Sequence, residues 1–301
     1  MSFNKIITKA LTMPKKTIAI ACPENDEVIQ TVIRATEANL CNFVLFGDKN
    51  KINIICKENN FILGNEVKIF DVNDQIKACN EAVKYVSYHQ ADILMKGFID
   101  TSIILKEVLN RDYGLRTTFI LNHVMVCKLP KFSRFLLLSD GALNIEPSID
   151  DLIAIVINTI SFAKKLGISN PKAALLSAVE KINPKMPSTI KCQKACEYFT
   201  VRNNNDVYGP IALDSALDPH SATLKDINNP VVGAADILIA PFIEVINVLY
   251  KGWVFGSDRV ESGGIILGAK APIVLVSRAD SPMTKINSIA LAIINSSEDN
   301  S

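Results

Sequence analysis

Short apolar runs alternate with amphipathic stretches along most of this chain. Residues 17–22 form a β-rich run, and a turn that begins at Pro23 leads into a segment with apolar residues at helical spacing. Three further apolar runs follow at 42–47, 67–71 and 91–97, separated by helical stretches such as 74–89. Continuous apolar strands that alternate with helices indicate a parallel sheet covered on both faces. The pattern therefore predicts an α/β fold.

The second half of the chain has the same alternation. Two consecutive strand-like runs are joined through Pro130 and Lys131, and a helix is expected over 148–166, where Ser148 and Asp151 have the spacing of a capping box. Later apolar segments lie at 172–179, 209–217, 235–241, 263–268 and 271–276, with a helix around 188–200 and a last helix at 285–295. No repeat or low-complexity linker divides the chain, so the α/β character extends throughout.

Composition narrows the possible partners. The 32 lysine and arginine residues nearly balance the 31 aspartates and glutamates, so no global field would draw the protein to nucleic acid or to an anionic membrane. No apolar run reaches the roughly 18 residues of a membrane span. The seven cysteines are scattered and odd in number, which indicates reduced thiols in a cytoplasmic protein. Cys192 and Cys196 are four residues apart but have no histidine nearby, and we expect no metal site.

Polar residues gather where the predicted strands end. In open parallel sheets, ligands bind outside the carboxyl ends of strands, where loops expose backbone N–H groups. The residues found there are Lys96, Gly97, Thr101, Ser102, Ser139, Asp140, Asn144, Ser177, Glu180, Glu244, Asn247, Ser277, Arg278 and Asp280. They are rich in hydroxyls and amides and contain no metal-ligand cluster. Such a set suits a site that binds an anion and polarises a carbonyl group.

Several familiar enzyme motifs are missing. No G-x-S-x-G elbow occurs, and none of the three histidines stands in a motif that would pair it with a serine. No G-x-x-x-x-G-K-[ST] loop occurs, which disfavours ATP cleavage of the P-loop type. The glycines of "GIILGAKA" lack the order of strand, glycines, helix and downstream acid that a nicotinamide site needs.

Eight segments in order carry a resemblance to a known family. They are "ILMKGFIDTSIILKEVLN", "GLRTT", "NHVMV", "LSDGALNIEPS", "LLSAVEKINPKMPST", "GPIALDSAL", "ADILIAP" with Asn247, and "GAKAPIVLVSRADS" with "SIALA". Together they resemble the phosphate butyryltransferase branch of the phosphate acetyl/butyryltransferase family, from about residue 15 to 293. The resemblance implies the reversible reaction of acyl-CoA with phosphate to acyl phosphate and CoA, with a short acyl group such as butyryl or acetyl. It implies no cofactor besides these substrates.

The same resemblance implies a fold and an assembly. We expect two α/β domains of the isocitrate/isopropylmalate dehydrogenase-like architecture with a cleft between them, in a homodimer. The first domain would comprise residues 1–120 with 268–301, and the second residues 121–267.

The resemblance also assigns roles to single residues. Ser277 and Arg278 match the Ser-Arg pair of the acyl-transfer centre, and Lys106 stands where acetyl-specific relatives carry an arginine. Arg116 matches an arginine common in the butyryl branch. Five further residues match positions that line the cleft: Thr101, Ser102, Asp140, Asn144 and Asn247. In the chemistry so implied, Arg278 or Lys106 holds phosphate and Ser277 or backbone N–H groups stabilise the developing oxyanion. Asp280 is the nearest acid in sequence for the CoA thiol proton.

Structural roles stand beside these functional ones. Lys106 would lie on a solvated helix face and Arg116 in a surface salt bridge. Asp140 and Asn144 would serve as local turn and cap residues, and Asn247 would cap a helix over 241–253. For "VLVSRADS", the structural interpretation is a polar loop at a strand end with Asp280 or Ser281 as the helix cap.

The sequence departs from the family pattern at four positions. Thr284 stands near the place of the aspartate proposed as base in acetyl-specific relatives, and Phe119 replaces a second basic residue after Arg116. Phe242 and Ile246 replace an acidic residue and a glycine common in the branch. We hypothesise a weakened enzyme or a preference for a bulkier acyl group. Two alternatives are an oxidoreductase on the same architecture, like hydroxythreonine-phosphate dehydrogenase, and a non-catalytic protein that binds CoA or acyl phosphate.

Overall fold

The computed structural model describes residues 1–275 and 280–297. The chain folds into two compact α/β units, which we describe separately. The terminal unit comprises residues 3–119 and 263–301, and the middle unit comprises residues 120–262 with the first two residues. The sequence-based domain boundaries, after 120 and after 267, stay a prediction. Within the described residues, no helix has both the length and the apolar character of a membrane span.

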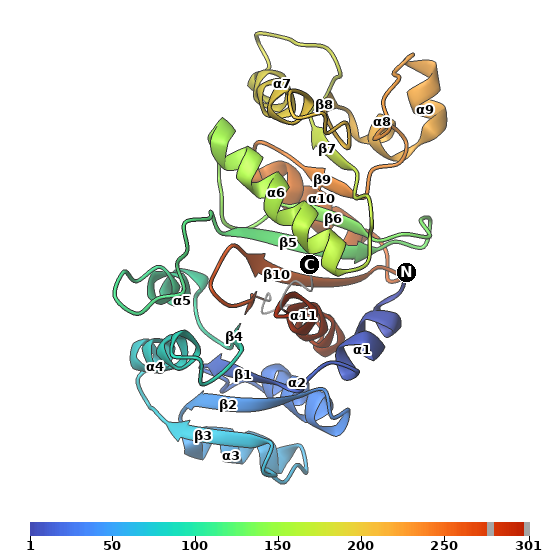
Figure 1. Cartoon of the computed structure of the whole chain (residues 1–301). Coiled ribbons are helices and arrows are strands. Elements are labelled where there is room, and N and C mark those ends of the chain that lie inside the picture. The colour runs from blue at the N-terminus through green and yellow to red at the C-terminus, as the bar shows by residue number, and fades with distance from the viewer. Residues whose placement is uncertain (276–279, 298–301) are drawn as a thin grey trace. The chain divides into compact units, whose positions relative to one another are not determined.

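The terminal unit is a six-stranded α/β sheet in the order β3-β2-β1-β4-β11-β10 (Figure 1). Its strands are β1 (Lys16–Ala21), β2 (Cys41–Gly47), β3 (Val67–Asp71), β4 (Ile93–Lys96), β10 (Glu261–Leu267) and β11 (Ile273–Val274). Its helices are α1 (Phe3–Leu11), α2 (Asp26–Glu37), α3 (Lys49–Glu58), α4 (Gln75–Ser87), α5 (Thr101–Val108) and α11 (Pro282–Asn295). The carboxyl-terminal segment thus completes a sheet begun by the amino-terminal one, because β11 lies beside β4.

The direction of the crossovers decides which face each helix covers. From β1 to β3 the chain moves along the sheet in one direction, and from β3 to β4 it moves back. Since crossovers between parallel strands are right-handed, α4 lies on the face opposite to α2 and α3. Both faces of the central strands are therefore buried, and Ile18 through Ala21 are inaccessible to solvent. This burial explains why the sequence shows continuous apolar runs instead of alternation.

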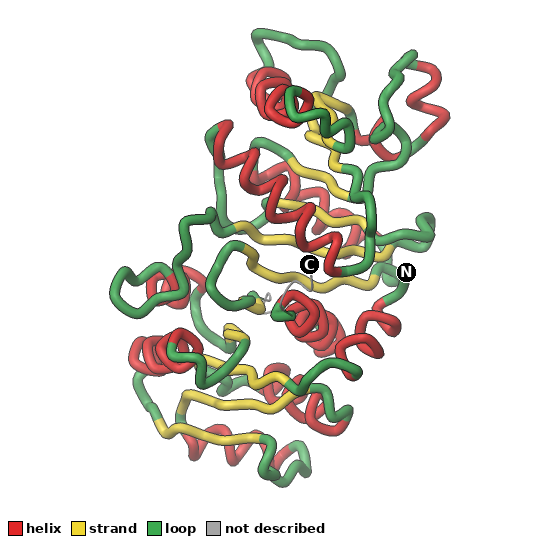
Figure 2. The backbone as a smooth tube through the Cα atoms, viewed as in Figure 1, coloured by secondary structure: helices red, strands yellow, loops and turns green. Residues whose placement is uncertain are grey.

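The middle unit contains five strands in the order β5-β6-β9-β7-β8. They are β5 (Asn122–Lys128), β6 (Leu136–Ser139), β7 (Ala173–Leu176), β8 (Val207–Ile211) and β9 (Ile237–Ile239). The helices are α6 (Ile149–Lys165), α7 (Pro187–Thr200), α8 (Leu213–Leu217), α9 (Pro219–Leu224) and α10 (Ile243–Gly256). In Figures 1 and 2, α6 crosses in front of the strands of this unit and α10 lies behind them. The predicted capping box of α6 is confirmed, because Ser148 Oγ accepts from Asp151 N at 3.1 Å.

The expectation of a purely parallel sheet is wrong at two places. The β5–β6 and β10–β11 pairs are antiparallel. Their connections, 129–135 and 268–272, are short and contain no helix. A parallel return needs a crossover of about a dozen residues or more, so these connections permit only hairpins. The remaining strand pairs within each unit are parallel, so most carboxyl ends still meet at one edge of each sheet.

Candidate active site

Gly97 lies at the end of β4, where the chain passes very close to the end of β1. Its N–H donates to Ala21 O at 2.9 Å, and the next N–H, that of Phe98, donates to Cys22 O at 2.6 Å. A Cβ at position 97 would lie 2.5 Å from Ala21 O and closer still to Cys22 O. Only glycine fits this approach, which fixes the start of the loop between β4 and α5.

Lys96 holds the same loop through hydrogen bonds from its side chain. Its side chain is buried, with 4% of its surface exposed, and Nζ donates to Ile99 O at 3.0 Å and to Gly97 O at 3.4 Å. The ammonium therefore holds the backbone that leads into α5. Thr101 and Ser102 form the first turn of that helix, half-buried and exposed respectively, and Lys106 lies exposed one turn further on. The predicted strand-end residues of this segment thus form one continuous loop and helix start.

The segment "VLVSRADS" is described only at its two ends. Ser277 and Arg278, the predicted acyl-transfer pair, lie outside the described residues. Asp280 is half-buried, and Ser281 rather than Asp280 is the N-cap of α11, because its hydroxyl accepts from Thr284 N at 3.1 Å. The hydroxyl of Thr284 lies 3.0 Å from Ser281 Oγ and takes part in the same cap.

A buried lysine holds the backbone at this helix start. Lys285, with 2% of its surface exposed, donates from Nζ to the carbonyl oxygen of Asp280 and to Glu27 Oε2, the latter at 3.0 Å. The lysine therefore connects the entry to α11 with the first turn of α2. The sequence analysis missed this residue. Its only signal there was a single charge at the head of the otherwise apolar stretch "KINSIALAIIN".

Arg116 lies exposed on the loop between α5 and β5. The loop is anchored on both sides of it, because Lys270 N donates to Leu115 O at 2.9 Å and Thr117 Oγ1 donates to Gly268 O at 2.6 Å. Phe119, the departure two residues beyond, is exposed as well. The structure thus presents Arg116 to solvent from a fixed backbone.

In the middle unit, Asp140 is the centre of a hydrogen-bonded loop at the end of β6. It is 2% exposed, and its Oδ1 accepts from Ala142 N at 2.7 Å and Leu143 N at 3.0 Å. Its Oδ2 accepts from His123 N at 3.2 Å and from Asn144 Nδ2 at 2.7 Å. These bonds fit the structural alternative for Asp140 and Asn144, because their polar atoms are used within the loop.

Asn247 secures the loop from α10. It lies inside the helix rather than at its start, so the expected capping role is not what the structure shows. Its Nδ2 donates to Gly141 O at 2.9 Å. Ile246, the neighbouring departure, is fully buried in the core, and a Cβ at position 141 would lie 3.1 Å from its Cγ2. Ile246 is therefore a packing residue of the α10 core face.

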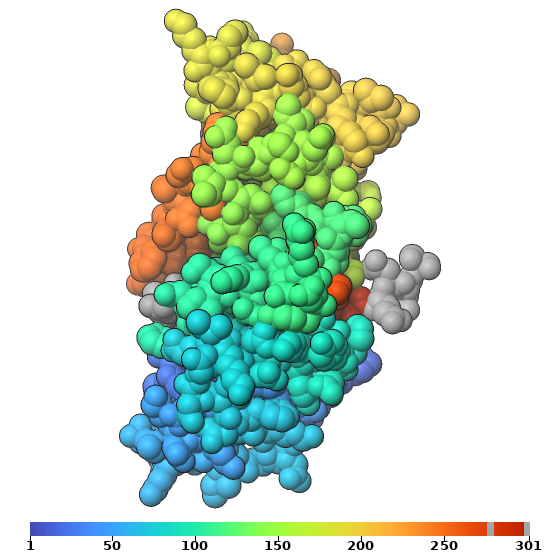
Figure 3. Space-filling model, turned by 90° about the vertical axis from the view of Figure 1, so that its left-hand side faces the viewer, coloured from blue at the N-terminus to red at the C-terminus, as the bar shows by residue number. Residues whose placement is uncertain are grey.

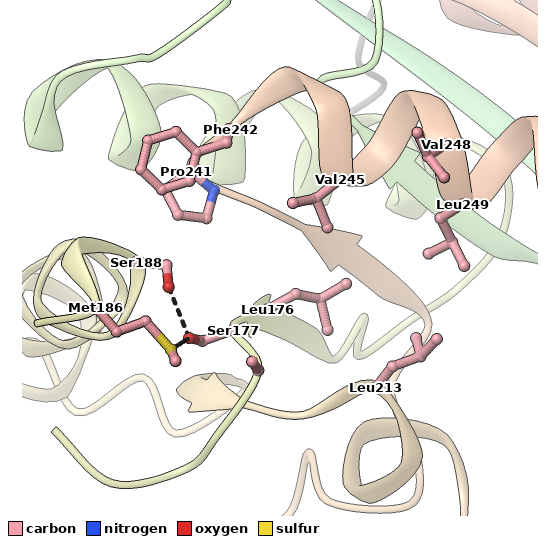
Figure 4. A pocket seen from close by; sticks show the side chains of 11 residues that line it. Leu176, Ser177, Met186, Ser188, Leu213, Pro241, Phe242, Val245, Val248 and Leu249 are labelled. Carbon is pink, nitrogen blue, oxygen red and sulfur yellow. Dashed lines mark hydrogen bonds between the residues drawn. The ribbon is translucent and has the colours of Figure 1, made fainter. Parts of the chain in front are cut away.

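Ser177 faces a cavity of about 560 Å³ that lies between the ends of β7 and β9 (Figure 4). Its Oγ lies 2.8 Å from Ser188 Oγ and donates to Met186 Sδ at 3.6 Å. The other lining residues are apolar: Leu176, Ala178, Leu213, Pro241, Phe242, Val245, Val248 and Leu249. Phe242, one of the departures from the family pattern, contributes its ring to this apolar wall. Met186, the N-cap of α7, and Ser188, in its first turn, were not predicted as site residues, although the segment that contains them carries part of the resemblance.

A cation lies next to Phe242, one of the residues that line this cavity. Lys191 Nζ lies 5.2 Å from the centre of the Phe242 ring and 2.8 Å from Glu146 Oε1. A cation at this distance from an aromatic face is attracted by the ring quadrupole.

The thiols offer no nucleophile to these sites. All seven cysteines are free and buried. Burial raises the pKa of Cys192 to about 12, with a smaller contribution from Cys196. A thiol with such a pKa is almost entirely protonated at neutral pH. In the parts of the chain that the structure describes, no group of three His, Cys, Asp or Glu side chains could hold a metal ion.

Comparison with known families identifies the chain. Residues 72–293 match the model of the family described as phosphate acetyl/butaryl transferase. The chain belongs to this family. It is 41% identical over 300 residues to a probable phosphate butyryltransferase of Bacillus subtilis, covering 99% of both chains. It is 38% identical over 303 residues to a phosphate acetyltransferase of Thermotoga maritima, covering 98% of this chain and 99% of that one. The predicted family is therefore confirmed.

Solved structures support the predicted fold class. A branched-chain phosphotransacylase from Enterococcus faecalis V583 matches with a TM-score of 0.81 and 35% identity, over 93% of this chain and 99% of that one. A putative 4-hydroxythreonine-4-phosphate dehydrogenase from Salmonella typhimurium matches with a TM-score of 0.61 at 12% identity, over 94% and 99% of the two chains. The second likeness concerns the fold alone. This member of the transferase family thus has the α/β, dehydrogenase-like fold that its sequence predicted.

Proposed function

We propose that this protein is a phosphate acyltransferase that interconverts acyl-CoA and phosphate with acyl phosphate and CoA, acting on short acyl groups such as butyryl or acetyl. The observation that supports this most strongly is the near full-length match to a phosphate butyryltransferase-type relative at 41% identity. The start of α5 after β4 agrees with it, since Thr101 and Ser102 place two hydroxyls at a helix N-terminus, a setting suited to an anion.

The proposed reaction is a direct displacement at the thioester carbonyl. A phosphate oxygen attacks the carbonyl carbon, a C–O bond forms, and the C–S bond breaks with release of the CoA thiolate. The proton of hydrogen phosphate passes to the thiolate, so acyl phosphate and free thiol leave with atoms and charge in balance. No covalent enzyme intermediate is required, which agrees with the burial of all seven cysteines.

The resemblance assigns the reacting groups to the terminal unit. Arg278 would hold phosphate through paired N–H donors, with Lys106 or Arg116 as further cations. Ser277 would donate to the developing oxyanion, a contact worth about 3–4 kcal/mol where one such donor has been removed. Asp280 would receive or return the thiol proton. In this proposal Lys96 and Gly97 shape the loop from which Thr101 and Ser102 face the substrate.

The proposal extends to the setting of the enzyme. It needs no cofactor beyond the substrates CoA and phosphate. We also propose a homodimer in the cytoplasm that binds neither nucleic acid nor membrane, in line with the balanced charge of the chain. Light scattering should then give a mass of twice the 33.0 kDa chain, and a mass equal to one chain would reject the dimer.

The test is phosphate-dependent release of CoA thiol by the purified protein. Butyryl-CoA and acetyl-CoA are supplied with and without phosphate, and the acyl phosphate product is trapped with hydroxylamine. We expect thiol and hydroxamate to form in equal amounts only when phosphate is present. CoA binding without thiol release would favour the non-catalytic alternative, and release without phosphate would indicate a hydrolase.

Two substitutions assign the proposed roles. Arg278→Ala should raise the apparent KM for phosphate or CoA and lower kcat, whereas Ser277→Ala should mainly lower kcat. Arg202→Ala is the matched control, because Arg202 is an exposed arginine at the end of α7, outside every predicted site. Wild-type kinetics in both site variants would remove this pair from the reaction.

A further inference from the structure

We propose that the apolar cavity of the middle unit binds the acyl chain of the CoA thioester and sets the preferred chain length. This inference rests on the proposed function, which supplies an acyl-CoA as ligand. It adds a site that holds the part of the substrate that does not react.

The composition of the cavity matches an alkyl chain with one polar end. Nine of its eleven lining residues are apolar, and the two exceptions are Ser177 and Ser188. Figure 4 shows these two hydroxyls together on the wall opposite Phe242, while Val245, Val248 and Leu249 project from α10 toward the space. A chain that enters past the hydroxyls would contact apolar atoms along the rest of its length. The two serine hydroxyls form the one polar end of the cavity.

The size and the position of the cavity favour a small ligand. Its volume of about 560 Å³ lies in the ordinary range for small-molecule pockets, roughly 300–1,000 Å³. Its walls come from separate elements of one unit, the ends of β7 and β9 and parts of α7, α8 and α10. It lies at the same strand-end edge as the Asp140 loop, because β6, β9 and β7 are parallel neighbours. Ligands of open α/β sheets bind at this edge.

The exposed side chains of α10 supply a driving force for binding. Val248 is 67% exposed and Val245 is 44% exposed, although both line the cavity. In Figure 3 the orange atoms that include α10 lie at the surface beside the green atoms of the same unit. A methylene group that leaves water for such a wall gains about 0.8 kcal/mol, a factor of about four in affinity. Two added methylenes should therefore tighten binding about fifteenfold while the chain still fits.

The experiment measures binding without turnover, using S-ethyl-, S-butyl- and S-hexyl-CoA, thioethers that cannot transfer an acyl group. We expect the Kd from calorimetry to fall about fifteenfold from ethyl to butyl and to fall again at hexyl. Val248→Trp fills part of the cavity from an exposed position, and should lower the ratio of ethyl to hexyl Kd at least tenfold. Val245→Trp is a second filling variant, in case the first is accommodated by a rotation of its side chain.

The control is Val201→Trp, an equally large change at a side chain that is 79% exposed in the same unit and outside the cavity. It should leave the wild-type ratio unchanged. Equal Kd values for ethyl and hexyl in the wild-type protein, or an unchanged ratio in both filling variants, would overturn the proposal. So would a filling variant that keeps its chain preference but changes its oligomeric mass, since that result assigns the α10 face to a contact between two copies.

The two proposals fail in different ways. If acetyl-CoA and butyryl-CoA are converted with phosphate but the thioethers bind with equal Kd values, the transferase activity is supported and the acyl-chain cavity is rejected. If no thioester is converted but thioether affinity rises with chain length, the cavity is supported as a binding site and the transferase activity is rejected.

Discussion

Gly97 offers a sharp test of how the loop after β4 is built. Gly97→Ala would place a methyl group 2.5 Å from Ala21 O, whereas ordinary contacts begin at 3.4 Å. The backbone must therefore move by about 1 Å. This movement would weaken the two N–H bonds from positions 97 and 98 to the end of β1. The matched control is Gly252→Ala in α10, where a new Cβ meets nothing within 4 Å.

The expected magnitude follows from these contacts. Two backbone hydrogen bonds contribute about 1 kcal/mol each, and forcing a methyl group into a packed site costs about 1–3 kcal/mol. Gly97→Ala should therefore lower the free energy of unfolding by about 3–5 kcal/mol, a large part of a typical total of about 5–15 kcal/mol. Gly252→Ala should raise it by about 0.5–1 kcal/mol, because alanine stabilises a helix interior relative to glycine.

Urea unfolding followed by circular dichroism measures both changes, and phosphate-dependent thiol release measures the loop. A displacement of about 1 Å near a reacting centre can cost about a hundredfold in rate, so kcat/KM should fall strongly in Gly97→Ala and stay at the wild-type value in Gly252→Ala. If Gly97→Ala unfolds within 0.5 kcal/mol of the wild type, the close approach is not rigid and the argument from its contacts is refuted.

Three further outcomes are expected. Asp140→Asn replaces a carboxylate oxygen, which accepts from backbone N–H groups, with an amide group that donates. It should lower the free energy of unfolding in urea by about 1.5–3 kcal/mol per lost hydrogen bond. An unchanged midpoint of urea unfolding would show that the loop relaxes freely. Lys285→Met removes the ammonium that joins Glu27 to the Asp280 carbonyl, with a similar loss of about 1.5–3 kcal/mol and a lower kcat, while retained kcat would separate this contact from the site. Because burial raises the pKa of cysteines such as Cys192, the folded protein should react slowly with a thiol reagent. In urea all seven thiols should become accessible and react, and a rapid reaction before unfolding would contradict the burial.

The elements with strong periodicity or caps were predictable from the sequence. The run "VKIFD" coincides with β3, and the helix predicted at 148–166 matches α6 within one residue at each end, since Ser148 and Asp151 form a capping box. The direction of the strands was harder to predict from the sequence, because the apolar runs of parallel and antiparallel pairs look alike. The information lies in the short connections before β6 and β11, which leave room only for hairpins.

The polar residues of the site were found by position and not by contact. Strand ends identified Gly97, Asp140 and Ser177, since chain order alone places such residues at one edge of a sheet. Lys285 and Ser188 escaped notice because their roles depend on partners far away in the sequence or on the packing of several elements. The structural alternatives for Asp140 and for the α11 cap, which proved to be Ser281, fit the observed hydrogen bonds. Local sequence thus located the edges but could not tell a ligand-binding side chain from one that holds a loop.

The connection of β11 and α11 to the terminal unit has a consequence during synthesis. The middle unit is nearly continuous in sequence, over 120–262, and all its strands are available before β11 is made. The sheet of the terminal unit is completed later, because β11 and the buried face of α11 come from residues 273–295 and join strands that are translated much earlier. Domains generally fold as units in order of synthesis. Here the amino-terminal strands would leave the ribosome with an open edge at β4, and the loop after β4 would reach its final setting only after the middle unit had folded.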